Sequence, residues 1–448
     1  MYEIELSADA LVTALLRLSE RETVSLLDSC GVGHLGSHLL IAGINPTEVH
    51  EITNEDPSET LRFLDEKLSG ELAAIFTISY DFGLKLEKIE SKRERLEPDV
   101  FLAMFGALIV HDYDSHATYL TGNKNDFAAI EAKLCNVTPS GLQDVTKTSS
   151  VTSNFTKKAY LSAIEEIKER IRRGDTYQTN LTQQLTVELG IGTTPQSIFW
   201  NLRKAHPAPF AAFITRENST VVSASPERFF RVDGNTITTS PIKGTRPRGK
   251  TKNEDQALKH QLLNSQKDIA ENTMIVDLLR NDLGRVSQFG TVRVEKLCDL
   301  EEHPTLFHLV STVTAELRES TTFSEILKAV FPSGSITGAP KISTMRIIEK
   351  IEPDPRGLSM GAIGIKVQSP KSKVQSLKNA DRHWTLDLRP WTLDLSVAIR
   401  TMVIRNNEAV FNVGGGIVID SDPESEFEES LLKAKALLDA IGAEFNFL

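Results

Sequence analysis

The chain has 448 residues, of which 40% are hydrophobic and 25% are charged, and its formal net charge is −11. This composition is that of an ordinary soluble protein with room for one elaborate domain or two to three simple ones. The acidic balance argues against a nucleic-acid partner, and the longest apolar run, 101–110, is too short to cross a membrane. The three cysteines are scattered without a C-x-x-C pair, and the first residues lack the layout of a signal peptide. We therefore expect a reducing, cytoplasmic location.

Hydrophobic periodicity predicts the elements in chain order. Strands are expected at 23–27, 73–79, 177–189, 210–214, 220–224, 229–232, 395–404 and 409–413. Helices are expected at 59–67, 128–134, 160–171, 255–263, 267–279, 322–330, 342–350 and 423–441. Strand clusters separated from helices indicate an α+β fold with antiparallel sheets. The Ser-, Thr- and Gly-rich stretch 136–154 is predicted to be a linker or surface loop between an N-terminal part, 1–135, and the remainder, 155–448.

The strand expected at 177–189 has two unlike faces. Gln178, Asn180 and Thr182 share one face with further polar residues, and mainly apolar side chains share the other. A row of amides and hydroxyls suits either a solvated sheet surface or the wall of a binding cavity. The spacing leaves both open, and the usual exposure of these residue types favours solvent.

Lys243 lies between an isoleucine and a Gly244-Thr245 turn, which holds it close to the backbone. Burial there would favour its neutral, nucleophilic form, whereas the alternative is a solvated lysine in a turn. The same stretch matches the phosphate-loop pattern G-x-x-x-x-G-K-T at 244–251. A phosphate loop follows a buried parallel strand, but the preceding residues 235–241 are polar and end in proline, so nucleotide binding is the least favoured alternative.

Two expected helices carry acidic pairs at a spacing of three residues. Asp268 and Glu271 share one face of the first helix, and Glu426 and Glu429 share one face of the last. Both pairs could converge on one Mg²⁺ ion, which takes few protein carboxylates and keeps other ligands. Acids in the first turn also suit the helix dipole, and this explains Asp268 and Glu426 without a metal.

Two glycine-rich segments could approach an anionic ligand. One is 414–416, which follows an expected strand, and the other is 331–341, which opens an expected helix. Glycines and a helix N-terminus allow backbone amides to reach a carboxylate. A β-bulge is the alternative for the first segment.

Six segments occur in the order seen in chorismate-utilising enzymes. They are 241–249, 271–286, 308–312, 334–341, 398–401 and 414–429. The chain resembles this family over 155–448 and, more loosely, in its N-terminal part. The resemblance implies a four-layer α/β/β/α sandwich of the anthranilate synthase component I type, with chorismate in a cleft and magnesium on its carboxylate.

The resemblance also implies a role for each candidate residue. Lys243 would add to ring position 2, His308 would protonate the departing 4-hydroxyl, and ammonia would then attack position 4. Glu271 and Glu429 would hold the metal, with Asp268 and Glu426 behind them. The residues implied in substrate binding are Asn180, Thr245, Thr337, Gly338, Arg400, Gly415 and Gly416.

Two positions separate the branches of the family. Anthranilate synthases usually have alanine at the position of Lys243, and isochorismate and salicylate synthases have a water-activating lysine at the position of Gln178. This chain therefore resembles the aminodeoxychorismate synthases, whose product leads to 4-aminobenzoate and folate. The chain has no G-x-C-x-G elbow, so ammonia would come from a glutamine amidotransferase subunit or from solution. The alternatives are an anthranilate synthase component I and a non-catalytic paralogue that binds chorismate.

Three further features bear on the resemblance. Leu26 to Ser29 resembles a segment that forms a tryptophan-binding pocket in relatives, although it could equally be strand core. Ser359 stands where the family usually has an aromatic residue. The stretch 366–393 replaces a short hairpin and contains a near-repeat, Trp-Thr-Leu-Asp-Leu, at 384–388 and 391–395.

Overall fold

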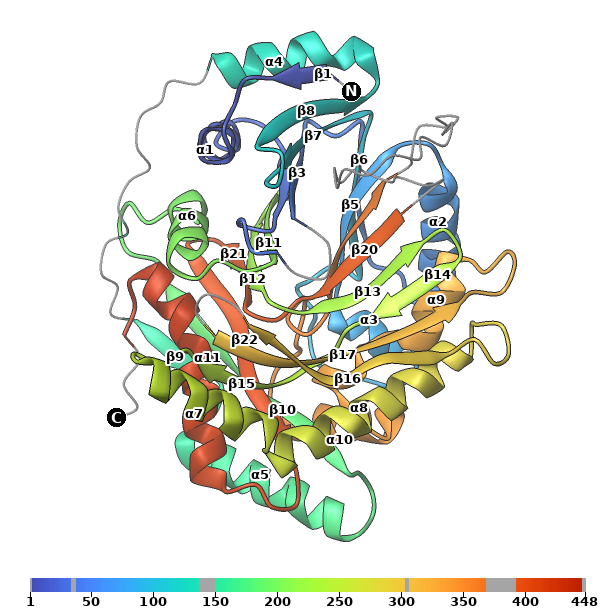
Figure 1. Cartoon of the computed structure of the whole chain (residues 1–448), viewed down its shortest axis with the longest axis vertical. Coiled ribbons are helices and arrows are strands. Elements are labelled where there is room, and N and C mark those ends of the chain that lie inside the picture. The colour runs from blue at the N-terminus through green and yellow to red at the C-terminus, as the bar shows by residue number, and fades with distance from the viewer. Residues whose placement is uncertain are drawn as a thin grey trace.

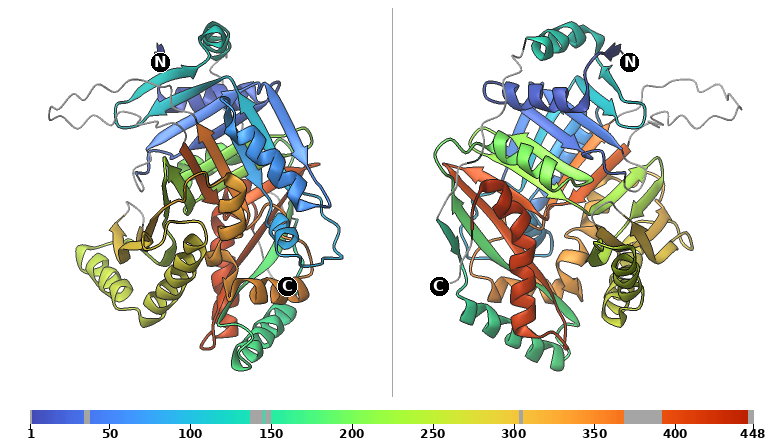
Figure 2. Two further views of the ribbon diagram at one scale, coloured as in Figure 1. Left: turned by 90° about the vertical axis from the view of Figure 1, so that its right-hand side faces the viewer. Right: turned by 60° about the vertical axis from the view of Figure 1, so that its left-hand side comes forward.

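Two large antiparallel sheets pack against each other, and helices cover their outer faces (Figures 1 and 2). The computed structural model describes residues 2–33, 38–136, 145, 150–302, 306–367 and 392–444. The expected α+β fold, a four-layer α/β/β/α sandwich, is confirmed.

The first sheet has twelve strands. Their order is β1 (Tyr2–Ile4), β8 (Ala117–Gly122), β7 (Ala107–Asp112), β3 (Leu39–Ile44), β2 (Val24–Asp28), β11 (Phe210–Thr215), β12 (Thr220–Ser225), β21 (Thr401–Arg405), β22 (Glu408–Ile417), β10 (Gln178–Glu188) and β18 (Gly338–Ala339), with β9 (Val151–Ser153) also on β10. Strand β9 lies within the segment 136–154, most of which is outside the described residues.

The second sheet has ten strands. Their order is β15 (Ile242–Pro247), β17 (Leu306–Glu316), β14 (Thr236–Thr239), β13 (Arg228–Asp233), β20 (Thr392–Val397), β19 (Ala362–Val367), β5 (Ala73–Ile78), β6 (Val100–Phe105) and β4 (Glu48–Ile52), with β16 (Arg293–Glu302) also on β17. Both sheets therefore combine strands from 1–135 with strands from the later part of the chain.

Three buried clusters explain the layering. One fills the space between the sheets and contains Phe101, Ile214 and Val221 among others. A second lies between the first sheet and four helices, α1 (Ala8–Leu18), α4 (Phe127–Cys135), α6 (Pro195–Ala205) and α11 (Pro423–Ile441). The third lies between the second sheet and α2 (Pro57–Ser69), α3 (Tyr80–Leu86), α8 (Gln266–Gly284) and α9 (Phe323–Val330).

Three further helices within the described residues pack on the strands. Helices α5 (Lys157–Arg172) and α10 (Lys341–Ile351) pack with β10, β22 and α11 around Tyr160 and Phe427. Helix α7 (Lys252–Leu263) packs on β15 and β17. Local signals set the helix ends, as in α11, where Asp422 caps the N-terminus and Gly442 ends the helix in the left-handed region at φ 75°.

Two sequence expectations are wrong. The single strand expected at 395–404 is two strands, because the chain leaves β20 in the second sheet and enters β21 in the first. Arg400, at φ 47°, lies in the connection. The solvated face expected for β10 is also wrong, since Gln178, Asn180 and Thr182 are buried.

The fold also bears on the phosphate-loop alternative and on the unusual stretch at 366–393. The first half of the phosphate-loop pattern lies on strand β15, so the loop of a nucleotide site is not formed there. Most of 366–393 is outside the described residues, including the first copy of the Trp-Thr-Leu-Asp-Leu repeat.

Candidate active site

Lys243 sits at an irregular point of strand β15. The pairing of β15 with β17 changes register between Lys243 and Thr245. Gly244 at this shift has φ 79°, and a Cβ atom there would lie 3.0 Å from the Cβ of Asp268, so the bulge requires glycine. The Lys243 side chain is half-buried, and its Nζ donates to the carbonyl oxygen of Ser335 at 3.4 Å. Lys243 is thus held close to the backbone.

Glu227 is a buried carboxyl group beside Lys243 that the sequence analysis missed. It lies between β12 and β13 and is 6% exposed. Its Oε1 accepts a hydrogen bond from the Ser335 hydroxyl at 2.7 Å, so Ser335 contacts Lys243 and Glu227 at once. Burial raises the pKa of Glu227 to about 7, although the Ser335 hydrogen bond and the Lys243 charge oppose the change. Near neutral pH this carboxyl group can therefore donate a proton.

His308 lies on β17, opposite Thr245 of β15. It is buried, and its Nδ1 lies 2.8 Å from the Thr245 hydroxyl oxygen. Lys243 pairs with the next residue of the same strand, Leu309. The structure thus brings His308 and Thr245 together on the strands that carry the lysine, and the proton-donor role of His308 stays a prediction.

The acidic residues of α8 and α11 approach the glycines at the end of β22. A Cβ atom at Gly416 would lie 3.4 Å from Oε1 of Glu271. A Cβ atom at Gly415 would lie 3.3 Å from Oε2 of Glu426 and 3.9 Å from Oε1 of Glu429. Carboxylates from two helices therefore approach two adjacent glycines, while their convergence on one Mg²⁺ ion stays a prediction.

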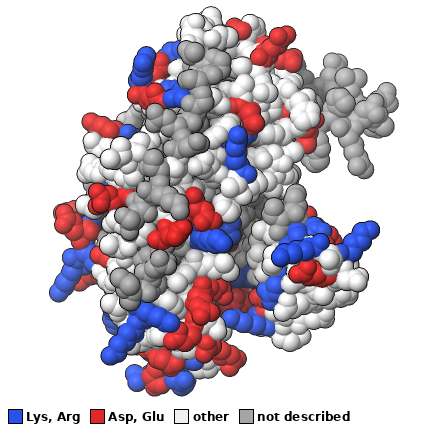
Figure 3. Space-filling model, turned by 90° about the vertical axis from the view of Figure 1, so that its left-hand side faces the viewer, with Lys and Arg blue, Asp and Glu red and all other residues white. Residues whose placement is uncertain are grey.

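Two lysines balance these carboxylates. Lys267 lies 3.2 Å from Glu426, and Lys433 lies 2.8 Å from Glu429. Burial would lower the pKa of Lys267, but Glu426, Glu271 and Glu429 outweigh it and raise the pKa. Burial would likewise raise the pKa of Glu429, but Lys433, Lys267 and Lys243 lower it. Figure 3 shows acidic and basic side chains mixed around a hollow on one face of the molecule.

The donor set fits a magnesium ion in its chemistry. Carboxylate oxygens are the ligands that Mg²⁺ prefers, and the ion needs only one or two of them if water and substrate oxygens supply the rest. Among the described residues, no group of three His, Cys, Asp or Glu side chains is close enough to hold an ion without such help. Asp268 forms an ion pair with Arg246 at 3.2 Å, so its place behind the metal ligands stays a prediction.

Strand β10 presents unpaired amides to the site. The side chain of Gln178 is fully buried, and neither its Oε1 nor its Nε2 has a hydrogen-bond partner within the part of the chain that the structure describes. The Nδ2 of Asn180 is unpaired in the same way. A Cβ atom at Gly416 would lie only 2.1 Å from Gln178 Nε2. The Gln178 side chain can therefore lie this close to β22 only because residue 416 is a glycine. Unpaired buried amides are costly, which points to a ligand that completes their hydrogen bonds.

The loop before α10 lies against the same strand. The backbone amide of Asn180 donates to the carbonyl oxygen of Thr337 at 2.8 Å. Gly338 has φ 135°, and a Cβ atom there would lie 2.0 Å from the carbonyl oxygen of Gln178. The Thr337 hydroxyl donates to Ser333 at 2.9 Å, within its own loop. Thr337 and Gly338 are thus placed next to the amides of β10, while their contact with substrate stays a prediction.

Arg400 lies at the crossing between the two sheets. Its carbonyl oxygen accepts a hydrogen bond from the Ala224 amide at 3.0 Å. Burial alone lowers the pKa of its guanidinium, and no carboxylate within the described residues offsets the effect. A half-buried arginine without an anionic partner suits an anionic ligand.

The structure also shows the surroundings of the Leu26 to Ser29 segment and of Ser359. A cavity of about 510 Å³, counted with its open mouth, lies between the sheets and is lined by Leu27, Ser29, Pro209, Phe210 and Ile365 among others. The Leu26 to Ser29 segment therefore borders a cavity, and its ligand stays a prediction. The hydroxyl of Ser359 accepts a hydrogen bond from the amide of Asn412 at 3.1 Å, so it supports β22.

The comparisons with known proteins agree with this arrangement. The family described as chorismate binding enzyme matches residues 26–370 and 389–439. The chain therefore belongs to the chorismate-binding enzyme family. The residues between the two matched parts, 371–388, fall inside the stretch 366–393.

Two curated relatives cover most of the chain. It is 35% identical over 407 residues to aminodeoxychorismate synthase component 1 of Escherichia coli (strain K12), covering 88% of this chain and 84% of the relative. It is 34% identical over 385 residues to the Bacillus subtilis (strain 168) protein of the same name, covering 82% and 76%. Among solved structures, anthranilate synthase component I from Streptococcus pneumoniae TIGR4 aligns with a TM-score of 0.76 at 27% identity, covering 91% of this chain and 93% of that one.

Proposed function

We propose that this protein converts chorismate and ammonia into 4-amino-4-deoxychorismate through a covalent adduct on Lys243. The observation that carries the proposal is the joint contact of Ser335 with Lys243 and Glu227. A nucleophile and an acid that share one neighbour can act on the same substrate, and a carboxyl group with a pKa of about 7 is matched to proton transfer at neutral pH.

The two groups account for the first half of the reaction. The neutral amine of Lys243 forms a bond to ring position 2, the two ring double bonds shift, and the bond from position 4 to its hydroxyl breaks. The hydroxyl leaves as water after it takes a proton. Glu227 is the donor that we favour over His308, because its proton is present near neutral pH.

The second half reverses the shift of the double bonds. Ammonia forms a bond at position 4, the bond between Lys243 and position 2 breaks, and the lysine returns to its starting form. The balance is chorismate plus ammonia giving 4-amino-4-deoxychorismate plus water. Gln178 takes no proton, because an amide has no useful basicity, so water is not activated at position 2.

The remaining residues bind and orient the substrate. Glu271 and Glu429 would hold a magnesium ion, which when bound would neutralise the ring carboxylate and draw electron density from the ring. Arg400 and the amides of Gly415 and Gly416 would hold the other carboxylate. The amides of Gln178 and Asn180 would pair with polar groups of the substrate.

A separate glutamine amidotransferase subunit would supply the ammonia, and the product would lead to 4-aminobenzoate and folate. Support comes from the name of the relatives, component 1, and from the lack of a glutaminase elbow in the sequence.

The test is chromatography of a reaction with chorismate, ammonium and magnesium, followed by a lyase that converts aminodeoxychorismate to 4-aminobenzoate. We expect 4-aminobenzoate only after the lyase is added. Anthranilate as the main product would favour the second candidate, anthranilate synthase component I, which the Streptococcus pneumoniae structure supports. No turnover despite chorismate binding would indicate a non-catalytic paralogue.

A further inference from the structure

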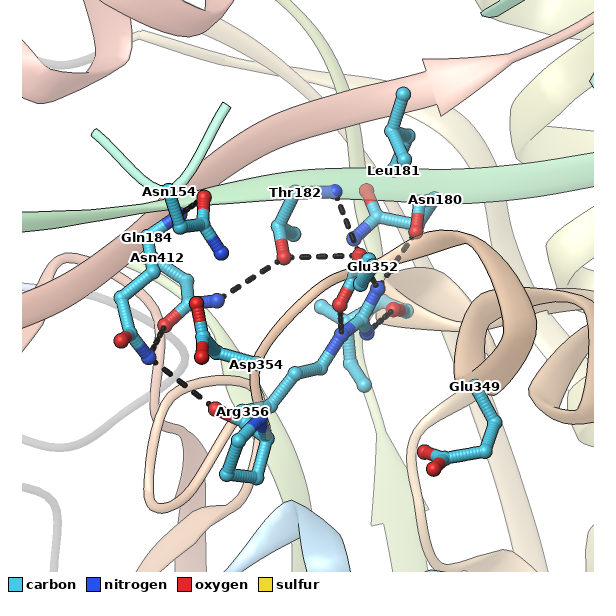
Figure 4. Close-up of polar contacts among 12 residues, drawn as sticks. Asn154, Asn180, Leu181, Thr182, Gln184, Glu349, Glu352, Asp354, Arg356 and Asn412 are labelled. Carbon is cyan, nitrogen blue, oxygen red and sulfur yellow. Dashed lines mark hydrogen bonds and ion pairs between the residues drawn. The ribbon is translucent and has the colours of Figure 1, made fainter. Parts of the chain in front are cut away.

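One edge of β10 is covered in an unusual way. Strand β18 pairs with its first residues, Gln178 and Thr179, and β9 pairs with 185–187. Between them the side chains of Arg356, Glu352 and Asn154 take the place of a strand, as Figure 4 shows, and the first two bind the residues next to β18. The carbonyl oxygen of Asn180 accepts a hydrogen bond from Nη2 of Arg356 at 2.7 Å. The amide of Thr182 donates to Oε1 of Glu352 at 2.7 Å.

Glu352 and Arg356 form a bidentate ion pair in the protein interior. Arg356 Nε donates to Glu352 Oε2 at 2.9 Å, and Nη2 donates to Oε1 at 2.7 Å. Each side chain is only 1% exposed, and the guanidinium lies 4.6 Å from the centre of the Tyr80 ring. Two buried charges in a planar fork tolerate little displacement, because any loss of geometry leaves a charge without compensation.

The same guanidinium reaches the loop before α10. Its Nη1 donates to the carbonyl oxygen of Ile336 at 3.0 Å. The carbonyl oxygen of the next residue, Thr337, accepts a hydrogen bond from the backbone amide of Asn180 at 2.8 Å. The preceding residue, Ser335, contacts Lys243 and Glu227. One buried arginine therefore connects the strand that presents the unpaired amides with the loop that contacts the candidate nucleophile.

We propose that the Glu352–Arg356 pair is a positioning element that sets Gln178 and Asn180 at the distance from Ser335 that the substrate requires. Within the described residues, the hydrogen bonds of the pair go to β10 and to the loop before α10 and not to Lys243, Glu227 or His308. Its effect on turnover rests on the proposed function, whereas its effect on β10 does not.

The chain offers a matched control. Arg216 pairs with Glu97 at 2.6 Å, its side chain is also 1% exposed, and it lies over the ring of Phe101 at 5.2 Å. This pair supports the contact between the sheets and has no bond to β10 or to the loop 334–338 within the described residues. Arg356→Lys and Arg216→Lys therefore each remove a guanidinium of equal burial from an ion pair, although Arg216 makes a single hydrogen bond to Glu97 and another to Thr77.

We expect both variants to lower the melting temperature, but only Arg356→Lys to raise the KM for chorismate, by about tenfold or more, with kcat within about threefold of wild type. Misplaced amides weaken binding of ground state and transition state alike. We also expect faster amide hydrogen exchange in the peptide that contains 178–182 in Arg356→Lys than in Arg216→Lys.

An equal change of KM in both variants, or none in either, would overturn the proposal. If the wild-type chain does not use chorismate, the proposed function fails while hydrogen exchange still decides the positioning role, since equal exchange in both variants overturns it. If Arg356→Lys does not fold, Glu352→Gln replaces it, because it keeps the shape and an acceptor for Thr182 but removes the charge.

Discussion

Ser335 contacts both of the groups that we propose for the reaction, the candidate nucleophile and the candidate acid. Its carbonyl oxygen accepts from Lys243 and its hydroxyl donates to Glu227, so a shift of this one residue would disturb both groups. Burial of Glu227 favours its protonated form, and a neutral acid beside the lysine avoids a buried ion pair.

Removal of the Lys243 amine gives the first prediction. Lys243→Ala should lower turnover with chorismate and ammonium by at least about 10²-fold, the scale expected when covalent help is lost. The control is Lys250→Ala, which removes an exposed lysine from the same segment and should leave turnover unchanged. Steady-state rates of the two variants decide the matter, and near-native turnover of Lys243→Ala would exclude the adduct.

The raised pKa of Glu227 gives the second prediction. An acid donates only while it is protonated, so kcat should fall as the pH rises through about 7, the pKa of this buried group. Glu227→Gln should lower kcat by about 10²-fold or more and remove this descending limb, because an amide does not titrate. A pH profile of the variant that keeps the wild-type limb would assign the proton to another group, with His308 the first to test.

Sequence patterns identified Lys243 but not Glu227, and the reason is physical. Lys243 stands beside a Gly-Thr pair that the sequence suggests is a turn; in the structure it is a bulge in strand β15, and this bulge limits where the lysine side chain can go. Glu227 is a lone carboxylate between two apolar strands, and its role follows from contacts with residues distant in sequence. The sequence signal for Glu227 is its position between two segments, 220–224 and 229–232, that are predicted to be strands.

At the scale of elements, β10 and the two acidic helices build the site. The spacing of three residues predicts that each acidic pair shares one helix face, but not that Glu271 and Glu429 lie near one end of β22, because that depends on how the helices pack. Hydrophobic alternation found β10 but not the burial of its polar face, because a cavity wall and a solvated surface have the same pattern. Periodicity predicts one strand over 395–404 because residues buried in either sheet are equally apolar, and it cannot show where a chain changes sheets.

The converging carboxylates give the third prediction. Glu429→Gln should weaken Mg²⁺ binding, measured by calorimetry on the free protein, by about tenfold or more, because a hard anionic ligand is lost. The control is Glu424→Gln on the same helix, since Glu424 is 56% exposed and pairs with Lys157. Unchanged Mg²⁺ affinity in Glu429→Gln, or full wild-type activity in excess chelator, would contradict this assignment.

At the scale of the whole molecule, the sandwich explains how the first part of the chain supports the site. Strands from the first part of the chain lie in both sheets, and Phe101 packs with Ile214 and Val221 between them. The inter-sheet core thus fixes where β12 ends and β13 begins, which is where Glu227 lies. The class of fold followed from the order of strands and helices, whereas the assignment of strands to sheets depends on contacts that no local pattern contains.

The last prediction concerns the source of ammonia. Glutamine hydrolysis by a cysteine needs a reactive thiolate, and burial raises the pKa of the Cys30 and Cys298 thiols. Cys135 lies exposed on α4, outside any G-x-C-x-G elbow. The purified chain should therefore aminate chorismate with ammonium but not with glutamine, and glutamine use should appear only when an amidotransferase subunit is added. Product formation is followed with each nitrogen source, with and without that subunit, and Cys135→Ser serves as a control that should change none of the rates. Glutamine-dependent turnover by the single chain would show that it carries its own glutaminase.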